Sequence, residues 1–219
     1  MLALQRQFTA ALVLLVLSFV ARAAESEQPS ARELIRRGSD QLIANKIDAA
    51  IKSFEKAVSI DPKVKAHLWQ LGIAYYYAGR FTDGRDLFAL HQTVNSHDVE
   101  NAVWHFLCVA RAEGIDVARK KLIPISGDPR VPMKQVHSLF AGTGAEEDVL
   151  KAASAVGDES NRKNALCYAH LYIGLYHEAL GNSEKALDHL RKAQSAYAQP
   201  HYMGRIARLH FQLQSVKNQ

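Results

Sequence analysis

The chain contains ten histidines, the side chains that most readily bind a metal ion at neutral pH. His170 and His177 are seven positions apart in a segment with helical periodicity. Seven positions correspond to two turns and roughly 10 Å along the axis, too far for both to bind one ion. The sequence also lacks the H-E-x-x-H arrangement of metalloproteases. The pattern therefore predicts histidines that pack or face solvent, and it predicts no metal and no other cofactor.

Other residue types that could support catalysis also lack the neighbours that the chemistry requires. The sequence has no glycine-rich phosphate loop and no G-x-S-x-G motif, and no supporting pattern surrounds Ser138 or Ser160. Neither cysteine has an obvious base beside it. We therefore expect that the protein is not an enzyme.

Cys108 and Cys167 are the only cysteines. In an oxidising compartment an even pair permits a disulfide. Each one, however, lies in an apolar helical stretch, where small thiols are common core residues. Separation along the sequence does not decide between a bridge and two buried thiols.

A repeat of 34 residues determines the elements that would position a site. Gly38 recurs as Gly72 and, three periods later, as Gly174, while Phe54 recurs as Phe88. A helix pair of this length cannot bury its own apolar face, so it must stack on neighbouring pairs and leave a concave surface. This organisation favours a binding scaffold over an enzyme.

These residues resemble the tetratricopeptide repeat family. In the first copy, 31–64, the small, aromatic and proline positions of the repeat are matched by Gly38, Ala50, Phe54, Ala57 and Pro62. Two further copies span 65–98 and 167–200. The resemblance implies an all-α fold, an α-solenoid of about five helical hairpins. The two pairs in 99–166 are degenerate, and residues 201–219 form a capping helix and tail.

Hydrophobic periodicity and helix-start signals give the expected elements more closely. Asp61 and Pro62 should begin the helix after the first repeat, and Thr143 with Glu146 suggests a capping box. Prolines and glycine predict an irregular loop over 124–132, and a polar turn is expected over 157–164. The expected helices outside the second and last repeats are Glu33–Ala44, Ile47–Val58, Val99–Glu113, Ile115–Leu122, Met133–Phe140, Ala145–Val156 and His201–Ser215.

On the repeat template, the inner face of each first helix lines the concave groove. This face is apolar and aromatic, so an apolar helix or an extended segment is the expected ligand, and an acidic chain terminus held by lysine and arginine is not. The alternative is that these aromatic side chains pack on the neighbouring helix pair. The groove residues are Trp69, Ile73, Tyr76, Tyr77, Trp104, Leu107, Arg111, Tyr168 and Leu171.

The N-terminus has the pattern of a secretory signal peptide. A positive start with Arg6 precedes an apolar run of 12 residues, 10–21, and Ala21-Arg22-Ala23 matches a cleavage site. Removal of residues 1–23 would leave a short leader, 24–30, which we expect to be disordered, and would lower the net charge from +5 to +3. We expect an exported protein, periplasmic or secreted, with no integral membrane anchor. Its mild, dispersed charge does not favour a nucleic acid partner.

The order of the parts is also similar to the NlpI-type family of bacterial outer-membrane lipoproteins. That similarity rests on Ala102-Val103-Trp104, on Leu139-Phe140-Ala141-Gly142 and on the segment 169–213, whereas the lipid-bearing cysteine is missing. The family implies an adaptor that brings enzymes together in the periplasm. We therefore expect a scaffold for a protein or peptide partner. The rival hypothesis is a structural module that forms a homodimer through its aromatic face.

Overall fold

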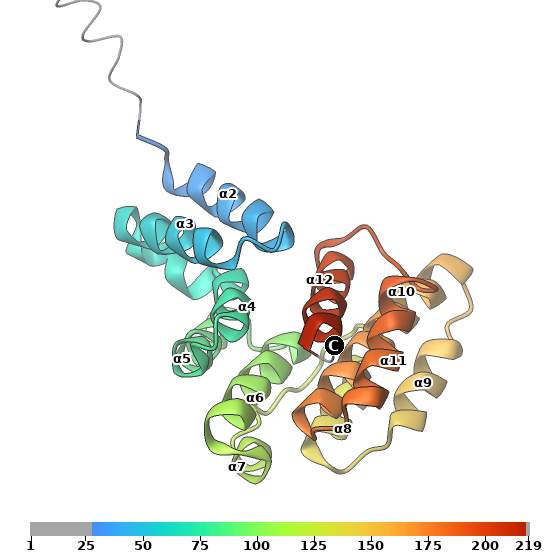
Figure 1. Ribbon diagram of the computed structural model, residues 1–219. Helices are drawn as coiled ribbons and strands as arrows, with labels where there is room; N and C mark the ends of the chain where they lie inside the picture. The colour runs from blue at the N-terminus through green and yellow to red at the C-terminus, as the bar shows by residue number, and fades with distance from the viewer. Residues whose placement is uncertain (1–27, 218–219) are drawn as a thin grey trace, which may run out of the picture. The chain divides into compact units, whose positions relative to one another are not determined.

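The computed structural model describes residues 28–217, and Figure 1 shows their arrangement. The expected signal peptide, 1–23, and most of the leader lie outside these residues. Within them the secondary structure is entirely helical, as expected, and most consecutive helices pack as neighbours. The helices are α2 Ala31–Ile43, α3 Ile47–Ile60, η1 Pro62–His67 (a 3₁₀-helix), α4 Trp69–Tyr77, α5 Phe81–His91, α6 Val99–Glu113, α7 Ile115–Lys120, α8 Met133–Ala141, α9 Glu146–Ser154, α10 Glu159–Ala179, α11 Ser183–Gln194 and α12 Tyr202–Lys217.

In three of the helix pairs, the same kind of contact joins the first helix to the second. A Cβ added at Gly38 would lie 2.8 Å from the ring of Phe54, sixteen residues later on the second helix of the pair. The same construction gives 2.6 Å between Gly72 and Phe88, and 2.8 Å between Gly174 and Leu190. Only glycine therefore allows the large side chain to lie directly against the backbone of the first helix. Each large side chain packs on the glycine of its own pair.

Several helix boundaries differ from those expected. Asp61 accepts a hydrogen bond from Lys63 N at 3.0 Å, but the helix that follows is a 3₁₀ segment, and Leu68 separates it from α4. The capping box with Thr143 is wrong, because Ala145 precedes α9 and its N–H donates to Asp148. The turn expected over 157–164 is also wrong. Asp158 caps a helix there, and α10 continues for 21 residues.

The chain curves from α2 through α6 to α11, and α12 lies on the inner side of this curve (Figure 1). A helix that caps the end of the stack was expected here. Helix α12 contacts α11 and α10 and also reaches α2. Its buried side chains include Ile206, Leu209 and His210, which are at most 1% exposed. The C-terminal helix is therefore part of the central core.

Candidate functional site

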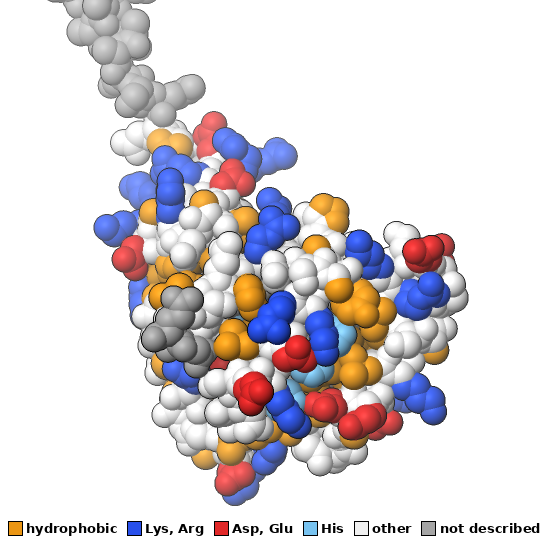
Figure 2. Space-filling model, turned by 45° about the vertical axis from the view of Figure 1, so that its right-hand side comes forward, with side chains coloured by type: hydrophobic (Ala, Val, Ile, Leu, Met, Phe, Trp, Pro, Cys, Tyr) orange, Lys and Arg blue, Asp and Glu red, His pale blue; other side chains and the backbone are white. Residues whose placement is uncertain are grey.

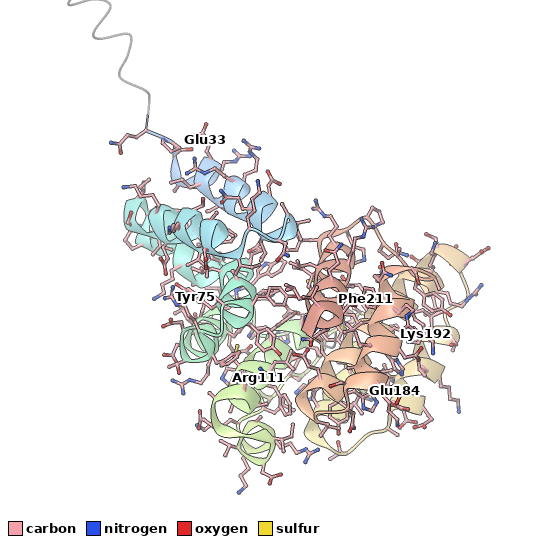
Figure 3. All side chains as sticks on the ribbon, viewed as in Figure 1. Glu33, Tyr75, Arg111, Glu184, Lys192 and Phe211 are labelled. Atoms are coloured by element: carbon pink, nitrogen blue, oxygen red, sulfur yellow. The ribbon has the colours of Figure 1, made fainter. Side chains whose placement is uncertain are left out.

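The aromatic inner face of the first helices is covered by α12. The hydroxyl of Tyr77 lies 3.2 Å from Nδ1 of His210, and Trp69 makes an edge-to-face contact with Tyr202, with ring centroids 5.1 Å apart. Figure 3 labels Tyr75 on α4, Arg111 on α6 and Phe211 on α12, and side chains fill the space between these helices. The expectation of an open groove along the whole face is therefore corrected, because the protein's own helix occupies its middle.

Glu178 on α10 is the polar centre beneath α12. Its carboxylate accepts hydrogen bonds from Tyr76 Oη at 3.0 Å and from His210 Nε2 at 2.5 Å, and Arg111 lies 3.9 Å away. Burial by itself would raise the pKa of Glu178, but His210, Tyr76 and Arg111 outweigh it and lower the pKa to about 2. The carboxylate is therefore ionised at neutral pH and ties α12 to α4 and α10.

The expected groove residues fall into three groups around α12. Ile73, Leu107 and Leu171 are at most 1% exposed and belong to the core. The other six line two separate cavities, one at each end of α12. Tyr76, Tyr77 and Arg111 line a small cavity of about 170 Å³ near the C-terminal end, and Trp69, Trp104 and Tyr168 line a larger cavity of about 360 Å³ near the N-terminal end.

The larger cavity, which we call the aromatic pocket, is walled by rings from five helices and one loop. Trp69 comes from α4, Phe88 from α5, Trp104 from α6, Tyr168 from α10 and Tyr202 from the start of α12. His201, just before α12, stacks on Tyr168 with ring centroids 5.2 Å apart, and its Nε2 lies 2.8 Å from Asn164 Oδ1. The pocket therefore combines residues that are far apart in the sequence.

The aromatic pocket also has an ionic wall, which sequence reasoning missed. Arg130 lies in the irregular loop, and its guanidinium donates to Asp98 at 2.5 Å, to Asp128 at 2.6 Å and also to Glu100. Three carboxylates thus surround one cation. The signal was present in the sequence, because Asp98 and Glu100 begin a strong helix while Asp128 and Arg130 occupy the neighbouring loop. No periodicity, however, places that loop beside α6.

Glu100 is the titratable group of this wall. Its side chain is 12% exposed, and burial together with Asp98 raises its pKa to about 7 against the opposing effects of Arg130 and Tyr172. The wall therefore carries one cation against two or three anions at neutral pH. Its net charge is negative.

Among the residues that line the aromatic pocket, Trp104 and Asn101 each have a buried polar atom without a hydrogen-bond partner within residues 28–217. These atoms are Nε1 of Trp104, a donor, and Oδ1 of Asn101, an acceptor. The amide nitrogen of Asn101 is satisfied, since it donates to Phe88 O and Gln92 Oε1, each at 3.1 Å. Buried polar groups are usually paired, so these two atoms are exceptions that a ligand in the pocket could satisfy.

Both cysteines are free and buried, so the structure contains no disulfide between them. Cys108 lies against α5, where a Cβ at Gly84 would be 2.8 Å from its sulfur. Cys167 lies 3.7 Å from the carbonyl oxygen of Ala193. Each thiol acts as a small core residue between two helices.

A second polar group lies away from the aromatic pocket, where α9, α10 and α11 meet. Glu146, His177 and His189 place one ligand atom each within 4.8 Å of one another. Sequence reasoning missed this group because it compared histidines along one helix only. These three residues come from three helices.

Comparison of the chain with models of known protein families finds no family that matches. Among residues 28–217, no helix is both long enough and apolar enough to cross a membrane.

Proposed function

We propose that the protein is an exported helical-repeat scaffold of the tetratricopeptide type that binds a protein or peptide partner at the aromatic pocket. The repeat type is supported by the glycine contacts of pairs α2–α3, α4–α5 and α10–α11, which keep the 34-residue register. An adaptor or assembly role is what the resemblance to periplasmic repeat adaptors implies.

The aromatic pocket is the observation that carries this proposal. It gathers three of the expected groove residues, Trp69, Trp104 and Tyr168, in one cavity of about 360 Å³. Rigid aromatic side chains in a pocket offer large contact area at a low cost in conformational entropy, which is why they dominate binding energies. The cavity is large enough for one or two side chains of a partner, but it is too small for a whole helix.

The composition of the wall indicates what those side chains are. The aromatic rings favour an apolar or aromatic side chain. The negative ionic wall around Arg130 favours a lysine or arginine beside it, because a cation can face both the rings and the carboxylates. We therefore expect a partner segment in which an apolar residue and a basic residue are neighbours. Its polar atoms would complete the hydrogen bonds of Trp104 and Asn101.

The rival hypothesis, a homodimer that buries the aromatic face, requires that α12 leave this face. The contacts of His210 with Tyr77 and Glu178 oppose that movement. The molecular mass of the protein in solution separates the two hypotheses. A monomer is expected, and a dimer whose formation is abolished by substitution of Trp69 would favour the rival.

The proposal is tested by binding measurements on the chain without residues 1–23. A partner captured from the exported fraction is mapped to a short segment, and that peptide is titrated against Tyr168→Ala and Trp69→Ala. Each substitution should weaken binding about tenfold or more. Tyr197→Ala is the matched control, because Tyr197 is a half-buried tyrosine that does not line the pocket. If both pocket variants bind like the parent while keeping their helicity, the aromatic pocket is not the site.

A further inference from the structure

The cluster of Glu146, His177 and His189 has the residue composition of a transition-metal site. Glu146 is the first residue of α9, His177 lies in the last turn of α10 and His189 lies in the middle of α11. Their ligand atoms all lie within 4.8 Å of one another, and His177 Nε2 is 2.7 Å from Glu146 Oε2. Glu184 and Lys192, labelled in Figure 3, mark the two ends of the helix that carries His189.

The cluster is enclosed but open on one side. His177 and His189 are 5% and 9% exposed, whereas the Glu146 side chain is 29% exposed. Figure 2 shows a small group of histidine side chains that reach the surface among lysine, arginine and acidic side chains. An ion could therefore enter past Glu146, while the two imidazoles are held in place by the surrounding core.

One ring nitrogen of each imidazole also has a polar partner outside the cluster. Nδ1 of His189 lies 3.0 Å from Nδ1 of His170, and Nδ1 of His177 lies 3.5 Å from Asn182 Nδ2. His170 is itself fixed by stacking on Tyr197, with ring centroids 5.1 Å apart and planes at 7°. Histidines that bind metals characteristically use their second nitrogen in this way, because that bond orients the ring. For His189 the bond to His170 leaves Nε2 free as the ligand atom.

The charges around the cluster suit a divalent cation. Two buried imidazoles and one partly exposed carboxylate face one another in this cluster, a donor set that a divalent cation can bind once its protons are displaced. The hydrogen bond from His177 lowers the pKa of Glu146, which is therefore ionised. Lys185 and Lys192 are the nearby cations that oppose binding, and Asp188 partly offsets them.

We propose that Glu146, His177 and His189 bind one zinc ion, with His170 and Asn182 orienting the two imidazoles. Two imidazoles and one carboxylate are a ligand set for zinc or its transition-metal neighbours, whereas magnesium and calcium prefer oxygen ligands. Three protein ligands leave the fourth tetrahedral position to water, on the side where Glu146 is exposed.

The geometry requires only small side-chain movements. Zinc bonds of roughly 2.0–2.1 Å place tetrahedral ligand atoms about 3.4 Å apart. The hydrogen bond of 2.7 Å between His177 and Glu146 would open, and the widest separation, at most 4.8 Å, would close. His177 changes its tautomer in this step, because Nε2 must lose its proton to bind the ion and Nδ1 then carries one. The Nδ1–H can donate a hydrogen bond to the amide oxygen of Asn182 after that amide rotates. The ion would bind α9, α10 and α11 together.

The experiment is a zinc titration, monitored by isothermal calorimetry, of metal-free protein that lacks residues 1–23 and carries no histidine tag. We expect one ion per chain with a dissociation constant in the micromolar range or below, and no binding of magnesium. Glu146→Gln and His189→Asn should each weaken zinc binding by more than about tenfold, and His170→Ala by about tenfold. Glu147→Gln, at the next and exposed carboxylate of α9, and His67→Ala, at an exposed histidine, should bind zinc like the parent.

A second measurement on the unaltered protein covers the case in which a variant fails to fold. Cobalt bound at this site should give the intense visible absorption of a tetrahedral complex. In nitrogen-15 spectra, zinc should shift the side-chain resonances of His177 and His189 and leave those of His67 unchanged. The proposal is overturned if zinc does not bind, if it binds Glu146→Gln and His189→Asn as tightly as the parent, or if it shifts the exposed histidines instead.

Discussion

Replacement of Phe54 by alanine tests the contact on which the repeat register depends. Phe54 is fully buried, and its ring occupies the place where a side chain at Gly38 would begin, 2.8 Å from the added Cβ. Truncation removes this ring from the core between α2 and α3 and leaves a cavity that the helices cannot fully close. The free energy of unfolding should fall by about 3–5 kcal/mol.

The partner substitution, Gly38→Ala, sharpens this test. In the parent the new methyl group collides with the Phe54 ring, which should cost about 1–3 kcal/mol despite the better helix propensity of alanine. In the Phe54→Ala background the same methyl enters the vacated space, and the propensity gain of about 1 kcal/mol is no longer opposed. Gly38→Ala should then be neutral or stabilising, so the double variant is more stable than the sum of the single costs predicts.

The assay is urea unfolding followed by far-ultraviolet circular dichroism for the parent, both single variants and the double variant. The free energy of unfolding should fall with urea concentration at the same slope in all four proteins, so that their unfolding midpoints report stability. Ile60→Ala is the control on the same helix, because Ile60 is 46% exposed and its truncation should change stability by about 0.5 kcal/mol or less. Strictly additive costs for Gly38→Ala and Phe54→Ala would refute the contact and, with it, the register.

Two further predictions concern buried ionisable groups. The pKa of Glu178 is about 2 in the folded protein, against an ordinary value of 4.5. The contacts of its carboxylate with His210, Tyr76 and Arg111 therefore stabilise the fold fully above pH 4.5, and this stabilisation is lost as the pH falls towards 2. Glu178→Gln should therefore be less stable than the parent at pH 6, by an amount on the order of 3 kcal/mol at most. Thermal melts should show this difference vanish near pH 2. A difference in stability that does not depend on pH would contradict the assigned ionisation. Burial raises the pKa of Cys108, and that of Cys167 to about 11, so a thiol reagent should label the native protein slowly, yet find two free thiols after denaturation without reductant. Fewer than two thiols would mean that a disulfide forms.

Much of the helical framework could be predicted from the sequence, because glycine spacing and apolar periodicity are local signals. The predicted span of α6, Val99–Glu113, coincides with the observed helix. The start of α10 could not be read from hydrophobicity, since residues 159–164 are polar and mostly exposed, as in a turn. The informative residue was Asp158, whose side chain accepts from Asn161 N at 2.8 Å and begins the helix.

The candidate site was only partly accessible to sequence reasoning. The expected groove residues on α4, α6 and α10 are either buried in the core or line one of the two cavities beside α12. The repeat template did not show what covers these residues, since the contacts of α12 with α4 join residues more than 130 positions apart, such as Tyr77 and His210. The Arg130 wall and the Glu146 cluster were missed for the same reason. Both depend on segments that meet only in the folded chain.

The position of α12 changes which substitutions can report on partner binding. Tyr76 and Tyr77 were expected to be anchors for a ligand, yet their hydroxyls bond to Glu178 and to the fully buried His210. Their removal would leave buried polar groups unpaired and loosen α12, so lost binding in Tyr76→Ala would reflect lost structure. Tyr168 is half-buried, lines the aromatic pocket and stacks on Tyr172 and His201. Its truncation changes the pocket wall with less disturbance of the core, and for that reason Tyr168→Ala is the decisive variant for the proposed function.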